Sequence, residues 1–138
     1  MDASVVAKWV LPDEPFQEKA LKLKEDHVSG VVELFAPSFI VLEVSNALWR
    51  AARLNRISVA DAKEALKALN NMGVELHELD WAQMAQSLSV ACDLDFTVYD
   101  ASYVFLSNEL RVPLITADKT LYETGRKRFR ILHLKDYL

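Results

Sequence analysis

The chain has 138 residues, 51% of them hydrophobic and 26% charged, and a net charge of −4. This length and composition fit one core-forming domain over residues 1–138 and exclude disorder, a collagen-like fibre and a coiled-coil rod. The mildly acidic charge does not favour nucleic acid as a partner, and no apolar run is long enough for a membrane helix, so we expect no contact with membranes.

Short apolar runs alternate with helical patterns along the chain. In chain order the patterns predict a strand over 1–6, a helix over 16–24, a strand over 31–36, helices over 38–54 and 58–70, a strand over 74–79, helices over 80–91 and 97–110, a strand over 112–116, a helix over 120–127 and a strand over 129–134. Strands separated by helices need crossover connections. We therefore predict a three-layer α/β/α sandwich with a mostly parallel central sheet, whose functional site lies at the carboxyl ends of the strands.

Polar residues with the spacing of helix caps precede four of the predicted helices. These residues are Ser38, Ser58 with Asp61, Asp80 with Gln83, and Thr97 with Asp100.

Four acidic residues stand out by position: Asp2, Glu43, Asp100 and Asp118. Three of them have purely structural interpretations. Asp2 fits a solvated chain start, Asp100 fits a capping box, and Asp118 fits the N-cap of the helix that follows it. Glu43 is harder to explain in this way, because it lies in an otherwise apolar turn of its helix.

Glu43 begins a polar stripe along one helix face, with Asn46, Arg50 and Arg53 at positions i+3, i+7 and i+10. A solvated face explains this stripe. An acid that binds a metal, a helping amide and two arginines that hold phosphates explain it equally well. On the second interpretation, Arg50 and Arg53 contact RNA phosphates or the carboxylates of a protein partner.

Gathered carboxylates have a clear chemical use. Three or four of them in one cleft repel one another, and their pKa values rise without a cation. Mg²⁺ and Mn²⁺ prefer such oxygen ligands, can activate a water molecule and stabilise the charge that develops on a phosphodiester.

Taken in series, four segments resemble the PIN-domain family and, within it, the VapC-type toxin nucleases of toxin–antitoxin pairs. The segments are Asp2–Trp9, Pro37–Phe39 with Glu43–Leu48, Tyr99–Tyr103, and Leu114–Lys119. The resemblance implies a three-layer α/β fold and single-strand RNA cleavage by water that bound Mg²⁺ or Mn²⁺ activates. It also implies a homodimer and a small VapB-like antitoxin whose tail occupies the cleft.

Carried onto this chain, the resemblance assigns metal binding and catalysis to Asp2, Glu43, Asp100 and Asp118. Glu43 either binds the metal or orients the attacking water. The resemblance also implies that Ser4, Asn46 and Thr116 orient carboxylates or water.

The chain departs from the family pattern at its start, where only Met1 precedes Asp2 and family members usually have a few more strand residues. We therefore expect that the first strand is short at its beginning or that the native chain starts upstream. This departure supports an alternative function, a PIN-like binding module without catalysis. A third interpretation is a phosphatase of the Asp-x-Asp type, built on Asp93 and Asp95.

Several other residues carry weaker predictions. The histidines are scattered and lack zinc-site spacing. Cys92 is the single cysteine, which excludes an internal disulfide and indicates a reducing compartment such as the cytoplasm, and we expect it in the core. The basic run 126–130 fits a solvated helix end, or an RNA contact. Four apolar residues fit either the core or a partner surface: Phe16, Leu21, Trp49 and Leu54.

Overall fold

The computed structural model describes all residues from Met1 to Leu138. The helices are α1 (Ala3–Val10), α2 (Gln17–Val28), α3 (Ile40–Arg53), α4 (Val59–Asn70), α5 (Trp81–Leu94), α6 (Val98–Glu109) and α7 (Lys119–Gly125). The strands are β1 (Phe35–Pro37), β2 (Glu75–His77), β3 (Leu114–Thr116) and β4 (Ile131–His133), and a 3-10 turn, η1 (Leu134–Asp136), follows β4. No helix has the length and apolar character needed to cross a membrane.

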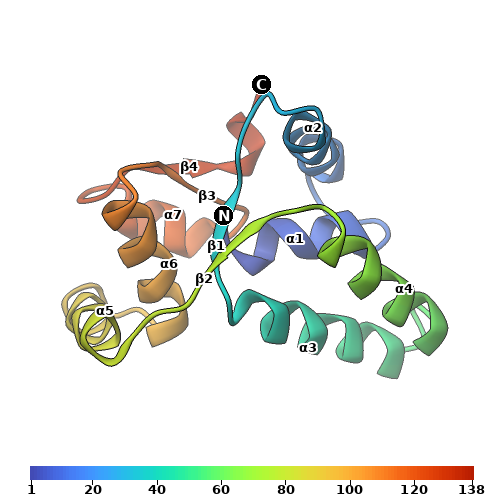
Figure 1. Ribbon diagram of the computed structural model, residues 1–138, viewed down its shortest axis with the longest axis horizontal. Helices are drawn as coiled ribbons and strands as arrows, with labels where there is room; N and C mark the ends of the chain where they lie inside the picture. Colours follow the sequence, from blue (N-terminus) through green and yellow to red (C-terminus); the bar gives the residue numbers. More distant parts are fainter.

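The strands lie in the middle of the molecule, with α5, α6 and α7 on one side and α1, α3 and α4 on the other (Figure 1). They form two parallel pairs, β1 with β2 and β3 with β4. The first residues of the chain connect these pairs: the Met1 amino group donates a hydrogen bond of 2.9 Å to the carbonyl oxygen of Phe35, and the Asp2 N–H donates one of 3.3 Å to Ile115. The predicted parallel α/β arrangement is confirmed, with shorter strands than the sequence indicated.

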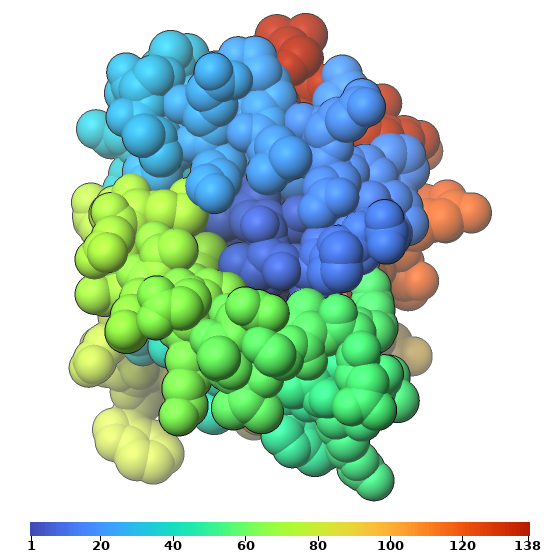
Figure 2. All heavy atoms as spheres, turned by 90° about the vertical axis from the view of Figure 1, so that its right-hand side faces the viewer, coloured from blue at the N-terminus to red at the C-terminus, as the bar shows by residue number.

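The predicted strand over residues 1–6 is wrong. Only Met1 and Asp2 precede helix α1, whose first turn is capped by the Asp2 side chain, which accepts a hydrogen bond from the Val5 N–H. The β-branched residues Val5 and Val6 favour strands in general, but here they share the buried face of the helix with Trp9. Figure 2 shows α1 recessed between the chain from α2 to β1 above and the helices α3 and α4 below.

Most predicted caps are confirmed. The side chains of Ser58, Asp80 and Thr97 each accept a hydrogen bond in the first turn of α4, α5 and α6, and Asp80 forms the full capping box with Gln83. Ser38 does not cap α3, which begins at Ile40 without a side-chain cap. The Ser38 N–H donates to the His77 carbonyl at 2.8 Å, so Ser38 still continues the β1–β2 ladder and the N-cap position falls one residue later, on Phe39.

The core joins the inner faces of α1, α3 and α6 to the strands. Its most completely buried large side chains include Val5, Leu48, Val104, Leu114 and Leu121. Each helix that starts at the carboxyl end of a strand is thereby held in place against the sheet layer.

Two predictions about burial are resolved by the structure. Cys92 is exposed, so its expected place in the core is wrong, because α5 packs chiefly against α6 and its outer face meets solvent. The four apolar residues that fitted either core or surface are all at least 44% exposed: Phe16, Leu21, Trp49 and Leu54.

Candidate functional site

The four acidic residues singled out in the sequence each lie at the start of a different helix. Asp2 and Asp118 are the N-caps of α1 and α7, and Glu43 and Asp100 lie in the first turns of α3 and α6. The partial positive charge of a helix N-terminus stabilises a nearby carboxylate. The fold thus directs four helix N-termini towards one region, which we call the acidic cluster (Asp2, Glu43, Asp100 and Asp118).

Asp2 is the most buried member of the acidic cluster, 4% exposed, and both of its carboxylate oxygens accept hydrogen bonds. The Ser4 hydroxyl donates to Oδ1 at 2.6 Å, and the Thr116 hydroxyl donates to Oδ2. These hydroxyls accept hydrogen bonds of 2.9 Å from the backbone N–H groups of Ala117 and Asp118. Two short hydrogen-bond chains therefore fix Asp2 to the loop that carries Asp118.

Glu43 is held by a residue that the sequence analysis missed. The Tyr103 hydroxyl donates a hydrogen bond to Oε2 of Glu43, and the Phe39 ring packs edge-on against the Tyr103 ring at a centroid distance of 5.3 Å. Tyr103 is only 3% exposed, and burial raises the pKa of its hydroxyl well above the ordinary value. The available signal was its spacing, because Tyr103 lies three residues after Asp100, on the same face of α6.

The acids of the cluster influence one another electrostatically. Burial raises the pKa of the Asp2 carboxyl above its ordinary value. Burial also raises the pKa of Glu43, and the negative charges of Asp100 and Asp2 raise it further. The pKa of Asp100 is raised in the same way by burial and then by the charges of Asp118 and Asp2. The ionisation of Glu43 and of Asp100 is thus disfavoured by the charges of other acids in the cluster.

The donor set of the acidic cluster fits a hard divalent cation. Carboxylate oxygens are the ligands that Mg²⁺ and Mn²⁺ prefer, and a cation among them relieves the repulsion that raises their pKa values. As the side chains are oriented, no three His, Cys, Asp or Glu residues lie close enough together to hold one ion. Binding therefore requires carboxyl groups to turn towards a common point. Asp100 is half-buried and Asp118 exposed, so both have room to turn.

The rest of the polar stripe on α3 leads away from the acidic cluster. Asn46 is exposed and hydrogen-bonds to none of the four acids. At a rise of 1.5 Å per residue, Arg50 and Arg53 lie about 10 and 15 Å further along the helix than Glu43. Both are exposed, and the Arg53 guanidinium lies over the Trp49 ring, 5.5 Å from its centroid. The stripe ends at the outer tip of α3 (Figure 1).

The Asp-x-Asp pair does not join the acidic cluster. Asp93 and Asp95 are exposed at the end of α5, where Asp95 is the C-cap in a left-handed conformation with φ of 56°. Nothing in this arrangement supports the phosphatase interpretation.

The basic run behaves as a solvated helix end. Arg126 lies over the Tyr122 ring at 5.1 Å, and Arg128 approaches Asp93 at 4.0 Å. Both arginines are exposed at the end of α7, and the run faces solvent.

The histidines lie apart and serve local structure. His27 contacts the Met72 carbonyl at 3.0 Å, and the buried His133 accepts a hydrogen bond from the Lys135 N–H at 3.0 Å. No group of three possible ligands that includes a histidine lies close together in the structure.

Comparison with known families gives a match to the PIN domain over residues 1–127. The chain belongs to the PIN-domain family. The family that the sequence resembled is thereby confirmed.

Individual relatives of this PIN domain include proteins named as ribonucleases. Ribonuclease VapC3 of Pyrobaculum aerophilum is 30% identical over 124 residues, which cover 89% of this chain and 91% of that protein. VapC ribonuclease Mb0985 of Mycobacterium bovis is 31% identical over 99 residues, 67% of this chain and 71% of that protein. Among solved structures, PAE2754 from Pyrobaculum aerophilum superposes with a TM-score of 0.67 at 25% identity, covering 97% of this chain and 88% of that one.

Proposed function

We propose that this PIN domain is a Mg²⁺- or Mn²⁺-dependent endoribonuclease that cleaves single-stranded RNA. The observation that carries the proposal is the acidic cluster, in which four helix N-termini bring carboxyl groups together and the charges of neighbouring acids help to raise the pKa values of Glu43 and Asp100. The relatives named VapC ribonucleases support the choice of RNA as the substrate.

In this proposal Asp2, Asp100 and Asp118 hold the cation, and Glu43 either joins them or orients the attacking water. When bound, the cation lowers the pKa of a water molecule and stabilises negative charge on the phosphodiester. Tyr103 keeps Glu43 in one orientation through its hydroxyl hydrogen bond.

Residues around the cluster position the acids. Ser4 and Thr116 direct both oxygens of Asp2 by donating hydrogen bonds to them. Such partners of metal ligands fix ligand geometry, and their loss typically lowers metal affinity or activity by about 10- to 100-fold. We assign Asn46 a contact with RNA or with water, because its amide is exposed on the same face of α3 as Glu43.

The proposal extends to the biological setting. We infer that the protein is the toxin of a toxin–antitoxin pair in the cytoplasm, that it forms a homodimer, and that a VapB-like antitoxin blocks the acidic cluster. Arg50 and Arg53 then hold RNA phosphates or antitoxin carboxylates, since a guanidinium binds either with the same fork of N–H donors. The relatives named VapC support this setting.

The test is cleavage of an unstructured RNA with Mn²⁺, with EDTA as the control. Asp100→Asn should abolish cleavage in a folded protein, because an amide supplies no negative charge to the cation. Asp61→Asn is the matched control: Asp61 occupies the same position after the N-cap Ser58 that Asp100 occupies after Thr97, on a helix outside the cluster. Equal cleavage by both variants would contradict the proposal.

The alternative function is a PIN-like binding module without catalysis. One observation favours it: both oxygens of Asp2 already accept hydrogen bonds within the chain. On this alternative the protein binds RNA or a protein tail but does not cleave RNA. The cleavage rate then stays at background with or without EDTA, and substitutions in the acidic cluster do not change it.

A further inference from the structure

Three aromatic rings lie beside the acidic cluster, where α3 and α6 begin: Phe39, Tyr99 and Tyr103. The Phe39 ring meets the Tyr99 ring edge-on at a centroid distance of 5.6 Å, and it meets the Tyr103 ring in the same way at 5.3 Å. The Tyr103 hydroxyl donates a hydrogen bond to Glu43. The three rings, which we call the aromatic cluster, therefore adjoin one of the four acids directly.

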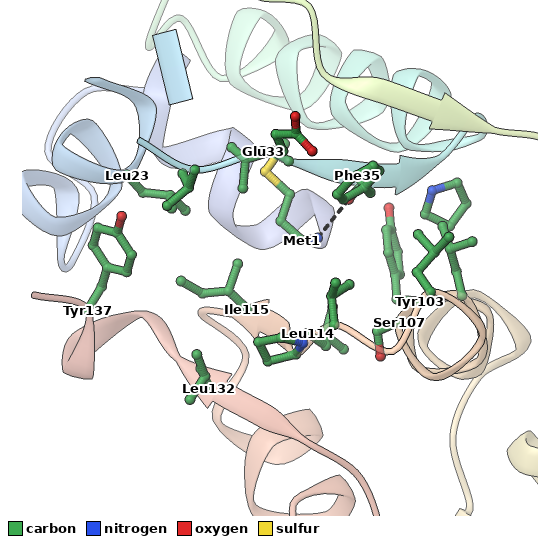
Figure 3. Close-up of a pocket in the computed structure, with 17 residues that line it drawn as sticks. Met1, Leu23, Glu33, Phe35, Tyr103, Ser107, Leu114, Ile115, Leu132 and Tyr137 are labelled. Atoms are coloured by element: carbon green, nitrogen blue, oxygen red, sulfur yellow. Dashed lines mark hydrogen bonds between the residues drawn. The ribbon is translucent and has the colours of Figure 1, made fainter. Parts of the chain in front are cut away.

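The two tyrosines of the aromatic cluster differ in exposure. Tyr103 is 3% exposed, and it borders an apolar groove between β1 and β3 that Leu34 and Leu114 also line (Figure 3). Tyr99 lies one helical turn earlier and is 56% exposed. The inner tyrosine thus supports Glu43, whereas the outer tyrosine presents a large part of its ring to solvent.

The first turn of α6 holds Tyr99 beside Asp100, its neighbour in the sequence. This turn is fixed at its start, because the Asp100 N–H donates a hydrogen bond of 3.2 Å to the hydroxyl of the N-cap Thr97. The Tyr99 ring is itself held by its contact with Phe39. A ring that is already ordered loses little conformational freedom when a ligand covers it, so this exposed ring is prepared for binding.

An unpaired RNA base matches the open Tyr99 ring in shape and in chemistry. Proteins that bind single-stranded nucleic acid stack bases on aromatic side chains, and this contact needs no charge. That property matters here, because the carboxylates of the acidic cluster repel the phosphates of an approaching RNA. In a duplex each base is already stacked and paired, so only an unpaired base can turn towards the ring.

The covalent structure of RNA brings a base to this position. Base, ribose and phosphate form one nucleotide, so an RNA with its phosphodiester at Asp100 has a base within the length of a nucleotide from Tyr99. We propose that Tyr99 stacks on one unpaired base of the RNA, in a nucleotide next to the phosphodiester at the acidic cluster. This inference rests on the proposed ribonuclease function, and it names the residue that selects single-stranded RNA.

The test is a cycle that combines changes in the protein with removal of single bases from the RNA. A short labelled single strand is the ligand, and its binding is measured by fluorescence anisotropy in EDTA, which keeps the RNA intact. A second set of RNAs lacks one base at a time, with ribose and phosphates kept. The proteins are the parent, Tyr99→Phe and Tyr99→Leu.

The stacking partner should reveal itself by its dependence on Tyr99. We expect the parent and Tyr99→Phe to bind the intact RNA equally and to lose affinity by at least about fivefold when one particular base is absent. Tyr99→Leu should bind the intact RNA at least about fivefold more weakly. Absence of that base should not weaken its binding further, because the stacking partner in the protein is already lost.

Phe16→Leu is the matched control for loss of an exposed ring. Phe16 is 46% exposed and meets the His133 ring edge-on at 5.5 Å, but it lies beyond the far end of α1, whose start is capped by Asp2. This variant should bind every RNA of the set as the parent does.

Three results would overturn the proposal. The first is an equal response of Tyr99→Leu and the parent to removal of every base, as expected if the ring meets only a protein partner. The second is an equal loss of affinity in Tyr99→Phe and Tyr99→Leu, which would assign the effect to the hydroxyl. The third is a parent protein that binds equally well whichever base is absent, a result that does not depend on the folding of any variant.

The binding cycle is independent of cleavage, so it separates this inference from the proposed function. If the parent fails to cleave RNA with Mn²⁺ while the dependence on Tyr99 is present, the proposed catalysis is contradicted and the stacking contact holds. If the parent cleaves and the dependence is absent, the stacking contact is contradicted alone.

Discussion

The carboxyl and amino ends of the central strands belong to the same strands but carry side chains of different chemistry. At the carboxyl ends, the Thr116 hydroxyl donates a hydrogen bond to Asp2 beside the other acids of the cluster. At the amino ends, Leu114 and Leu34 border an apolar groove. The difference arises because helices begin after the carboxyl ends of β1 and β3, and the N-termini of these helices stabilise carboxylates. Changes at the two ends should therefore have separable effects on chemistry and on stability.

The largest expected effect on chemistry is that of Asp100→Asn. We expect cleavage to fall by at least about 100-fold, since even the loss of a partner of a metal ligand lowers activity by about 10- to 100-fold. The Tm without metal should stay equal or rise, because one source of repulsion is removed. Cleavage rates on unstructured RNA and melting curves without metal, each with Asp61→Asn as the control, check these two expectations. A large fall in Tm would indicate a structural role instead.

The largest expected effect on stability lies at the other end of the strands. Leu114 is 1% exposed, so Leu114→Ala should lower the free energy of unfolding by about 2 to 5 kcal/mol. Cleavage per folded molecule should change little, because Leu114 pairs with β4 and lies away from the acids. Urea unfolding and the cleavage rate, measured on the same preparation, test this separation. A loss of activity without a loss of stability would contradict it.

Thr116→Val should affect both properties, because Thr116 joins the strand to the acidic cluster. The variant loses the donor to Asp2 and the acceptor for the Asp118 N–H, at a site that is 0% exposed. We expect cleavage to fall by about 10- to 100-fold and stability by about 1 to 3 kcal/mol. The control is Ser107→Ala, which removes a hydroxyl bound to the Val104 carbonyl at the amino end and should leave cleavage intact.

Stability without metal should depend on pH through the raised pKa values of Asp2, Glu43 and Asp100. A carboxyl group with a raised pKa binds protons in the folded state at a pH where the unfolded chain has released them. The free energy of unfolding therefore increases as the pH falls from 7 through the raised values, and levels off near the ordinary values of 3.8 and 4.5. Melting curves at several pH values check this, and Asp100→Asn should flatten the increase.

Mn²⁺ should reverse this trend. Because the cation binds ionised carboxylates, its stabilising effect should be larger at pH 7 than at pH 4. An equal shift in Tm at both pH values would argue against a carboxylate site.

The smallest expected effect concerns the outer end of α3. Arg50→Ala combined with Arg53→Ala should weaken RNA binding several-fold and reduce its salt dependence, because fewer counterions are released. Mn²⁺ affinity should stay constant, since no acid is changed. Arg126→Ala with Arg128→Ala is the control for a basic surface away from the stripe. If this control alone weakens binding, the end of α7 holds the RNA backbone.

Much of the fold was predictable because local signals agreed with the tertiary structure. The caps at Ser58, Asp80 and Thr97 mark three helix starts correctly, since each cap hydrogen bond forms within four residues of chain. Ser38 failed as a cap because it still continues the pairing of β1 with β2, a contact far away in the sequence, so that the N-cap position falls on Phe39. The first strand failed because burial of Val5 and Trp9 on one helix face outweighs the strand preference of valine.

The acids of the candidate site were predictable from the sequence, but the residues that hold these acids in place were less so. Helix starts after β1 and β3 brought Glu43 and Asp118 to one end of the sheet layer, as a parallel arrangement requires, and the hydrogen bond from the Asp2 N–H to the Ile115 carbonyl places Asp2 beside them. Tyr103 escaped notice because a tyrosine on a buried helix face is ordinarily core, and its bond to Glu43 spans 60 positions of sequence. The apolar groove could not be predicted at all, because it depends on how far apart β1 and β3 lie.

The measurement that tests the central claim most directly is Mn²⁺ binding at pH 7, followed by electron paramagnetic resonance, for the parent protein, Asp61→Asn and Asp100→Asn. We predict that the parent and Asp61→Asn bind with the same Kd and that Asp100→Asn binds at least about tenfold more weakly. Identical binding by all three proteins would contradict a metal site in the acidic cluster.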